Sequence, residues 1–381
     1  MTARKRILLI GATGSIGTST IEVIAEHLDE LELVGIAARQ NAAQLEHIQQ
    51  SMQVKHCVLT ERDGDEALIE MLRNVPADIV VMAMVGSAGL RPTLTAIEAG
   101  MDVALANKEV LVMAGEFVMR AARTSGVRIL PIDSEHNAIF QCLEGVPRKS
   151  DIRRLVLTAS GGPFRDWTLD QMANATVADA MKHPNWSMGR KINVDSASMA
   201  NKGLEMIEAR WLFDMPPERI DVVVHPQSIV HSMVECIDGS LLTQWSPPSM
   251  TYAIRHALFY PQRRPSSTPG VDFNQALDLN FSPPDNQRFP CLRLAKEALQ
   301  KGGTAPARFN AANEIAVEHF LQKRLPFLAI PQVIEHCLTN GVQEWTANRL
   351  EDILAADQTC RKQAAVFIAD KFPSNPLTHD N

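Results

Sequence analysis

The sequence predicts an α/β protein in which an N-terminal Rossmann-type parallel sheet precedes an α+β catalytic or connective domain and a C-terminal helical bundle. Short apolar runs alternate with helical patterns over residues 1–150, and a glycine-rich turn directly follows the first of these runs. From residue 291 onward the pattern is helical throughout. Unbroken apolar strands between helices are typical of a parallel sheet covered by helices on both faces.

The elements of the first domain follow in order along the chain. We predict strands over residues 6–10, 31–37, 57–59, 78–84, 102–104 and 128–131. We predict helices over residues 15–27, 42–50, 91–99 and 115–125. These elements define a dinucleotide-binding domain that covers residues 1–150.

The pattern changes after residue 150. Strands are predicted over 155–159 and 222–224, and a long helix over 199–213, with intervening loops rich in Pro, Gly, Trp and Asn. We therefore expect a second domain over residues 151–261. Residues 262–290 hold many prolines and few periodic apolar positions, which is typical of a linker. Residues 291–381 form the predicted bundle, with breaks at Gly-Gly-Thr-Ala-Pro, Leu-Pro and Asn-Gly.

Composition excludes several classes of partner. The 381 residues carry a formal net charge of -7 and no basic run, so neither nucleic acid nor an anionic membrane is an expected partner. The six cysteines are far apart and form no CxxC motif, as expected for free thiols in a reducing compartment. We find no targeting segment and no apolar run of about 18 residues. We therefore expect a soluble, cytoplasmic protein.

The glycine-rich turn predicts a dinucleotide site. Gly11, Gly14 and Gly17 separate the first strand from the first helix, where glycines permit close backbone approach and the helix N-terminus attracts phosphate. The second strand ends without the carboxylate that NAD-preferring sites place there, and Arg39 follows it. We therefore predict NADPH rather than NADH, with a solvated surface arginine as the alternative interpretation of Arg39.

Two carboxylates follow the last strand of the predicted sheet. Asp133 and Glu135 stand where ligands bind in open parallel sheets, and a carboxylate pair suits a hard divalent metal. The alternative is helix capping by Asp133 or Ser134. Lys108 opens a possible helix, where it is either a contact for substrate oxygens or an ordinary first-turn residue.

The segment 158–205 contains further polar candidates. Ser160 precedes two glycines, a combination that suits an anion nest. Trp186 lies in a loop bounded by Pro and Gly, which indicates either a lid that excludes water or a buried anchor.

A polar helix is predicted after this loop. Asn201 and Glu205 are four residues apart and share a helix face, flanked by Lys202, with Ser196 near the helix start. One helix can thus offer hydroxyl, amide and ammonium groups to a phosphate and a carboxylate to a metal. Gly203 hints at close approach of another element. A solvated polar face is the alternative.

Several long motifs resemble the 1-deoxy-D-xylulose 5-phosphate reductoisomerase family almost from end to end. They are GATGSIGTST, ALANKEVLV, PIDSEHNAIFQCL, TASGGPFR, KHPNWSMGRKINVDSASMANKGLEMIEA, VVHPQSIVHSMVE and GGTAPARFNAANEIAV. The resemblance implies a V-shaped homodimer whose subunits have an NADPH domain, a connective catalytic and dimerisation domain and a C-terminal bundle. The segment 245–254 departs from the family pattern, and Arg39 replaces a common small residue.

The resemblance also implies roles for individual residues. The implied catalytic residues are Lys108, Asp133, Glu135 and Glu205, of which the three acids are the metal ligands. The implied substrate contacts are Lys108, Ser134, Glu135, Ser160, His183, Trp186, Ser196, Asn201, Lys202 and Glu205. The implied cofactor contacts are Thr13, Gly14, Ser15, Ile16, Arg39, Gln40, Asn41, Asn107, Glu109 and Gly189. His225 in the HPQS motif is retained as well, but a purely structural role is open for it and we assign it none.

The implied activity is the metal-dependent, NADPH-linked conversion of 1-deoxy-D-xylulose 5-phosphate to 2-C-methyl-D-erythritol 4-phosphate, a step in the non-mevalonate route to isoprenoid precursors. The expected metal is Mg²⁺, Mn²⁺ or Co²⁺, which would act as a Lewis acid. Two other functions remain open at this point. One is a metal-free NADPH oxidoreductase acting on another small phosphorylated substrate, and the other is a non-catalytic NADPH sensor.

Overall fold

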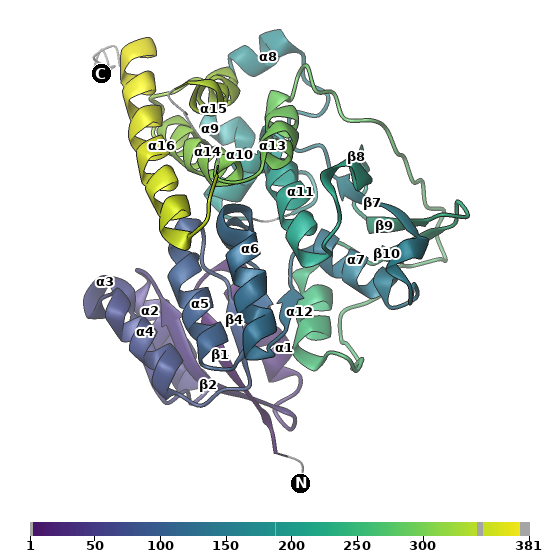
Figure 1. Cartoon of the computed structure of the whole chain (residues 1–381). Helices are drawn as coiled ribbons and strands as arrows, with labels where there is room; N and C mark the ends of the chain where they lie inside the picture. The colour runs from purple at the N-terminus through teal and green to yellow at the C-terminus, as the bar shows by residue number, and fades with distance from the viewer. Residues whose placement is uncertain (1–2, 187, 341–345, 374–381) are drawn as a thin grey trace, which may run out of the picture.

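A computed structural model describes residues 3–186, 188–340 and 346–373 and confirms the predicted fold class (Figure 1). The first sheet has the order β3-β2-β1-β4-β5-β6, and all of its strand pairs are parallel. The strand order reverses between β1 and β4, and ligands bind beside such switch points at the carboxyl ends of the strands. The strands are β1 (Lys5–Ile10), β2 (Leu31–Ala38), β3 (His56–Leu59), β4 (Ile79–Met82), β5 (Asp102–Leu105) and β6 (Ile129–Pro131).

Helices cover both faces of this sheet. Alternate residues of β1 belong to separate cores, since Ile7 and Leu9 pack on one face and Leu8 and Ile10 on the other. The short helices α3 and α4 were not predicted. The helices of this part are α1 (Ser15–Ala25), α2 (Ala42–Ser51), α3 (Thr60–Asp63), α4 (Asp65–Asn74), α5 (Leu90–Glu98) and α6 (Lys108–Ser125).

The second sheet is smaller and mixed, with the order β10-β9-β7-β8. Only β7 and β8 are parallel within it. The strands β9 and β10 were not predicted. Its strands are β7 (Ile152–Ala159), β8 (Ile220–Val224), β9 (Val230–Cys236) and β10 (Leu241–Trp245). The helices in and before this segment are α7 (Ser134–Leu143), α8 (Leu169–Ala173), α9 (Val177–Ala180), α10 (Arg190–Ala197), α11 (Ala200–Leu212) and α12 (Met250–Phe259).

Helix α12 returns to the first sheet. Its side chains Ile254 and Leu258 are fully buried in the core that also contains Ile7 and Leu9. The following segment, 262–290, passes around the outside of the second sheet (Figure 1). A bridge between Val224 and Ser282 fastens it there.

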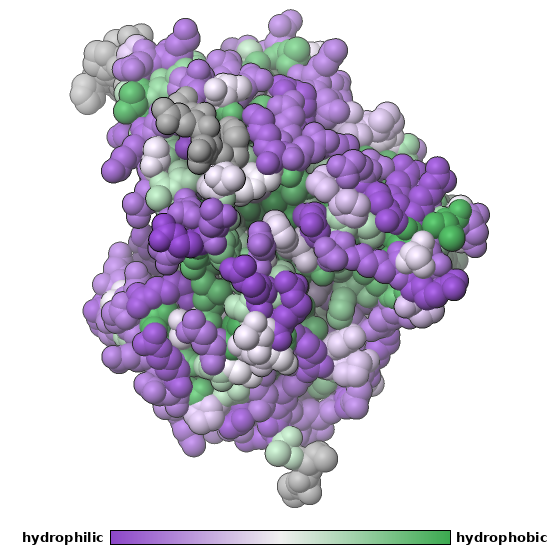
Figure 2. Space-filling model, in the orientation of Figure 1, coloured by the Kyte–Doolittle hydropathy of each residue, from purple (hydrophilic) through white to green (hydrophobic). Residues whose placement is uncertain are grey.

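The C-terminal part is helical, as predicted. Its helices are α13 (Pro290–Lys301), α14 (Ala305–Leu321), α15 (Ile330–Thr339) and α16 (Leu350–Lys371). Among the described residues, no helix is long and apolar enough to cross a membrane. The predicted Asn-Gly break extends into residue 341, and the end of the predicted bundle covers 374–381, so these parts lie outside the described residues. Polar residues cover most of the face shown in Figure 2.

Helices α6 and α11 pack closely, and this contact assembles the site. A Cβ atom on Gly115 of α6 would lie 2.2 Å from the Trp211 ring of α11, so only glycine permits the approach. The N-terminus of α6 carries Lys108, and α11 carries Lys202 and Glu205. Residues that are about 100 positions apart in the sequence therefore meet at one cavity.

Candidate functional site

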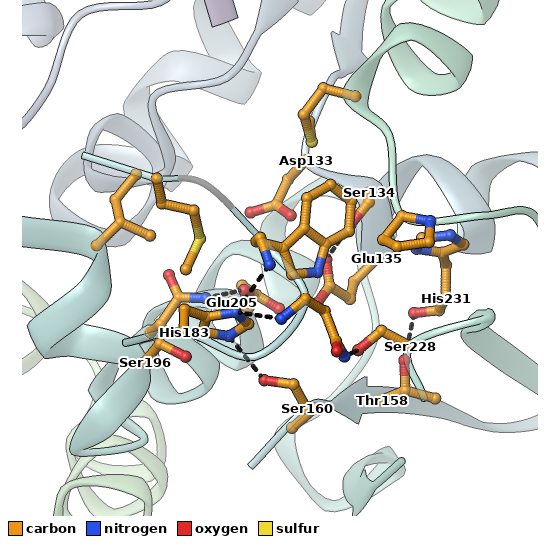
Figure 3. Close-up of a pocket in the computed structure, with 18 of the residues that line it drawn as sticks. Asp133, Ser134, Glu135, Thr158, Ser160, His183, Ser196, Glu205, Ser228 and His231 are labelled. Atoms are coloured by element: carbon orange, nitrogen blue, oxygen red, sulfur yellow. Dashed lines mark hydrogen bonds between the residues drawn. The ribbon is translucent and has the colours of Figure 1, made fainter. Parts of the chain in front are cut away.

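A cavity of about 320 Å³ lies at the carboxyl end of the first sheet. It extends from the N-terminus of α1 to α10, α11 and the second sheet. Figure 3 shows several of its polar side chains, among them Asp133, Glu205 and Ser160. Of the predicted site residues, its lining includes Ser15, Ile16, Lys108, Asp133, Ser134, Glu135, Ser160, His183, Trp186, Ser196, Asn201, Lys202 and Glu205.

The glycine turn at one end of the cavity has the expected close packing. Gly11 has φ +93°, and a Cβ atom on it would lie 2.4 Å from the Ala83 carbonyl oxygen. A Cβ atom on Gly17 would lie 2.4 Å from the carbonyl oxygens of Gly11 and Ala12. Gly14 supplies no side-chain cap to α1. The first amides of α1 are therefore available to an anion, as a dinucleotide site requires.

The remaining predicted cofactor residues lie outside the cavity lining. Arg39 and Gln40 are exposed at the end of β2, and Gln40 donates a hydrogen bond of 3.3 Å to Glu61. Asn41 caps α2 by accepting a bond from the Gln44 amide. The cofactor residues outside the lining are Thr13, Gly14, Arg39, Gln40, Asn41, Asn107, Glu109 and Gly189.

Three carboxylates converge at the centre of the site. Oxygen atoms of Asp133, Glu135 and Glu205 lie within 4.8 Å of one another. Asp133 precedes α7 but its side chain makes no capping bond, so the capping interpretation of this residue is wrong. Ser134 donates a hydrogen bond of 2.6 Å to Glu135 and does not cap the helix either. Three clustered carboxylates are the oxygen donors that a hard divalent cation takes, so these residues fit the expected metal.

Two buried lysines bind the same carboxylates. Lys108 Nζ lies 3.1 Å from Glu205 and 2.8 Å from the Asn201 amide oxygen, and it also pairs with Asp133. Lys202 Nζ lies 2.7 Å from Glu135 and pairs with Glu205 as well. Lys108 is therefore a site residue and not an ordinary first-turn lysine. Three carboxylates against two ammonium groups leave one excess negative charge for a cation.

Burial and these ion pairs set the protonation of the cluster. Burial alone would raise the pKa of the Asp133 carboxyl, but the Lys108 ammonium holds it below its usual range. The pKa of Glu135 is instead raised, by burial and by the neighbouring Glu205 carboxylate. Burial alone would lower the pKa of Lys108, but Asp133 and Glu205 raise it well above its usual value. Asp133 and Lys108 thus keep their charges at neutral pH.

Ser160 and His183 also line the cavity and are bonded to each other. The His183 Nε2 atom lies 3.0 Å from the Ser160 hydroxyl, and its Nδ1 atom accepts bonds from the amides of Asn185 and Trp186. Because Nδ1 is an acceptor, the proton of the neutral ring is on Nε2, which donates to Ser160. Burial lowers the pKa of His183 to about 4, so the ring is neutral at pH 7.

The long helix predicted over 199–213 is confirmed as α11 (Ala200–Leu212), but Ser196 is not part of it. Met199 has φ +61° and separates α10 from α11, so the prediction of one continuous helix carrying Ser196 near its start is wrong. Ser196 lies in the last turn of α10 instead. The predicted close approach at Gly203 is confirmed, since a Cβ atom there would lie 2.5 Å from the Ala295 Cβ of α13.

The loop before α10 lies over the cavity. Trp186 is half-buried and lines the cavity, with its ring 6.1 Å from that of His231. This position favours the lid interpretation over a buried anchor. Gly189 is the exposed N-cap of α10.

Some lining residues were missed by the sequence analysis. Thr158, Ser228 and His231 face the cavity (Figure 3). Asn185 lines it as well. The motif HPQSIVH contains two of them, but only His225 was considered there. The His225 ring accepts bonds from the Ile229 and Val230 amides, which favours a structural role.

The atypical segment 245–254 forms an ordinary strand-to-helix connection. Ser249 caps α12 through the Thr251 amide. Pro248, Ser249 and Met250 line the cavity, so this departure from the family pattern borders the site.

Comparisons with known proteins agree with this geometry. Sequence profiles of 1-deoxy-D-xylulose 5-phosphate reductoisomerase match residues 7–63 and 46–115, and profiles of its C-terminal domains match residues 129–213 and 245–363. The reductoisomerase of Acidithiobacillus ferrooxidans is 47% identical over 97% of this chain and 98% of its own.

Two solved structures are similar over nearly the whole chain. A DOX-P reductoisomerase in complex with NADPH, fosmidomycin and magnesium has a TM-score of 0.89 and 40% identity, covering 97% of this chain and 100% of its own. The Zymomonas mobilis reductoisomerase in complex with NADPH has a TM-score of 0.87 and 41% identity, covering 96% of this chain and 99% of its own. The chain therefore belongs to the 1-deoxy-D-xylulose 5-phosphate reductoisomerase family.

Proposed function

We propose that the chain converts 1-deoxy-D-xylulose 5-phosphate and NADPH, with one proton, to 2-C-methyl-D-erythritol 4-phosphate and NADP⁺. The observation that carries this proposal is the cavity itself. It joins the open N-terminus of α1 to a cluster of three carboxylates and two lysines, and Ser160 and His183 also line it. A cofactor anion, a cation and a phosphorylated substrate each find suitable groups there.

We assign the metal to Asp133, Glu135 and Glu205. A bound divalent cation supplies Lewis-acid polarisation of the substrate's carbonyl and hydroxyl oxygens. Lys108 and Lys202 remain charged beside these acids, so they hold the carboxylates in place and can donate to substrate oxygens. Magnesium occurs in the similar structure described above, whereas Mn²⁺ and Co²⁺ remain expectations.

We assign the substrate phosphate to Ser160, His183, Ser196, Asn201 and Lys202. The neutral His183 ring donates from Nε2 to the Ser160 hydroxyl and thereby orients it. Trp186 would close over the bound sugar phosphate and exclude water from the reacting carbons. The phosphate lies remote from these carbons, so its binding energy can support closure and catalysis.

We assign NADPH to the turn at residues 13–16, to Arg39, Gln40 and Asn41 at the 2′-phosphate, and to Asn107 and Glu109 near the nicotinamide. Gly189 belongs to the loop over the cofactor. NADPH supplies the hydride for the reduction. The close packing of Gly11 and Gly17 supports the first assignment, and the exposure of Arg39 beside that turn supports the second. The domains would be those predicted, at 1–150, 151–261 and 291–381, joined by the linker 262–290.

We also propose that the chain forms a homodimer through the second sheet. Strand β10 lies at the edge of this sheet, and an apolar patch is visible over the β9–β10 hairpin at the right of Figure 2. Ile237, Leu241 and Trp245 are exposed there. An exposed apolar edge strand favours association with another chain. Sedimentation of the chain and of Trp245→Lys tests this, because only the variant should be monomeric.

NADPH oxidation by the metal-stripped chain tests the proposed activity. We expect no oxidation with 1-deoxy-D-xylulose 5-phosphate until Mg²⁺, Mn²⁺ or Co²⁺ is added. Undiminished turnover in EDTA would contradict the assignment of the three acids to a metal.

A further inference from the structure

Lys191 forms a buried ionic bridge outside the cavity. Its Nζ atom lies 2.8 Å from Glu109 at the start of α6 and 2.8 Å from Asp195 one turn along α10. The side chains of Lys191, Glu109 and Asp195 are only 16%, 7% and 1% exposed. Lys191 does not line the cavity, so it does not reach the substrate there.

A third element holds the same bridge. Asn313 of α14 donates a hydrogen bond of 2.8 Å to the second oxygen of Asp195. The bridge therefore ties the first domain, the helix that follows the Trp186 loop, and the C-terminal helices to one another. Removing one partner of a buried ion pair leaves the other charge uncompensated, so this tie resists separation of the three elements.

The bridge is flanked by site residues at both ends. Glu109 directly follows Lys108, which binds Asp133 and Glu205. Asp195 directly precedes Ser196, which lines the cavity. A shift of either carboxylate would therefore move a group in the substrate cavity.

We propose that Lys191 is a positioning residue that fixes the Glu109 carboxylate, a proposed cofactor contact, and keeps α6 and α10 in register. This inference rests on the proposed function, because it takes Glu109 as a cofactor contact. Burial alone would lower the pKa of Lys191, but Asp195 and Glu109 raise it, so the bridge persists at neutral pH.

A double-mutant cycle with the full-length chain tests the proposal. The variants are Lys191→Met, Glu109→Gln and their combination, and the readout is the NADPH dissociation constant from cofactor fluorescence. We expect Lys191→Met to weaken NADPH binding about tenfold, which lies within the coupling found for residues in contact. The double variant should bind NADPH no more weakly than whichever single variant has the lower NADPH affinity. Lys191→Arg should keep most of the wild-type affinity for NADPH.

Lys149→Met is the matched control, because Lys149 makes an exposed bridge to Asp214 and neither residue lines the cavity. It should leave NADPH affinity unchanged. Unchanged NADPH affinity in Lys191→Met, or additive effects of the two single variants, would overturn the proposal even if the melting temperature falls. If Lys191→Met does not fold, Lys191→Gln replaces it in the same cycle. Failure of the wild-type chain to oxidise NADPH with the sugar phosphate would instead overturn the proposed function.

Discussion

Replacing Glu205 by glutamine perturbs the centre of the proposed metal site with little change in volume. The Glu205 carboxylate is 1% exposed and accepts bonds from Lys108 at 3.1 Å and from Asn201 at 2.5 Å, besides its pair with Lys202. Glutamine removes the charge and turns an amide group toward an ammonium group. The variant therefore loses one proposed metal ligand and two buried ion pairs.

The size of the effect follows from these contacts. Removing one preorganised electrostatic group from an active site costs about 3–4 kcal/mol of transition-state stabilisation, and the lower end applies because both lysines keep a second carboxylate partner. A loss of about 3 kcal/mol in the transition state lowers the rate roughly 10²-fold. We therefore expect kcat to fall at least about 10²-fold at saturating Mg²⁺.

NADPH binding separates this effect from general damage. Glu205 does not touch the glycine turn, so the NADPH dissociation constant from fluorescence titration should stay almost unchanged. Glu218→Gln is the control, since Glu218 is exposed and does not line the cavity. A loss of NADPH affinity as large as the loss of kcat would refute the assignment of Glu205 to the metal.

Three further changes give independent tests. Arg39→Ala should lower the ratio of NADPH affinity to NADH affinity about tenfold, because a cation beside a 2′-phosphate stabilises the bound cofactor by about 1–2 kcal/mol. An unchanged ratio would show that Gln40, Asn41 or the backbone discriminates between the two cofactors. Gly17→Ala should lower the free energy of unfolding by about 1–3 kcal/mol and weaken NADPH binding, because its Cβ would clash with carbonyl oxygens; urea unfolding at wild-type stability would contradict this. Burial lowers the pKa of His256 to about 4 in the folded chain. Between about pH 6.5 and pH 4 the unfolded chain therefore binds more protons than the folded chain, so the free energy of unfolding falls as the pH falls. His256→Gln should reduce the stability difference between pH 7 and pH 5 by about 1 kcal/mol in urea titrations; an identical difference would show that other groups cause the acid sensitivity.

The first sheet was predictable because its strands are continuous apolar runs. β1, β4 and β5 are buried on both faces, and burial on both faces removes the need for polar alternation. Strand β10 was missed because it lies at an edge and contains Thr243 and Gln244 among its apolar residues. The packing of helix α12 in the core of the first sheet was not predicted, because the core residues that it contacts lie far away in the sequence.

The site residues that directly follow the end of a predicted strand could be predicted from the sequence. Asp133 and Glu135 stand directly after β6 and reach the cavity as expected. The break at Met199 was not predictable, because a methionine in the left-handed region is stabilised by its surroundings and leaves no signal in the sequence. The bridge from Lys191 to Glu109 joins residues 82 positions apart, and no periodicity reports such a contact.

The most direct test of the central claim is the stoichiometry of the reaction in the presence of Mg²⁺. NADPH consumption is followed by absorbance while the product is identified by mass spectrometry and NMR. We predict one 2-C-methyl-D-erythritol 4-phosphate for each NADPH oxidised, and neither change after metal removal. NADPH binding without any product from 1-deoxy-D-xylulose 5-phosphate, or product formation that persists in EDTA, would contradict the account.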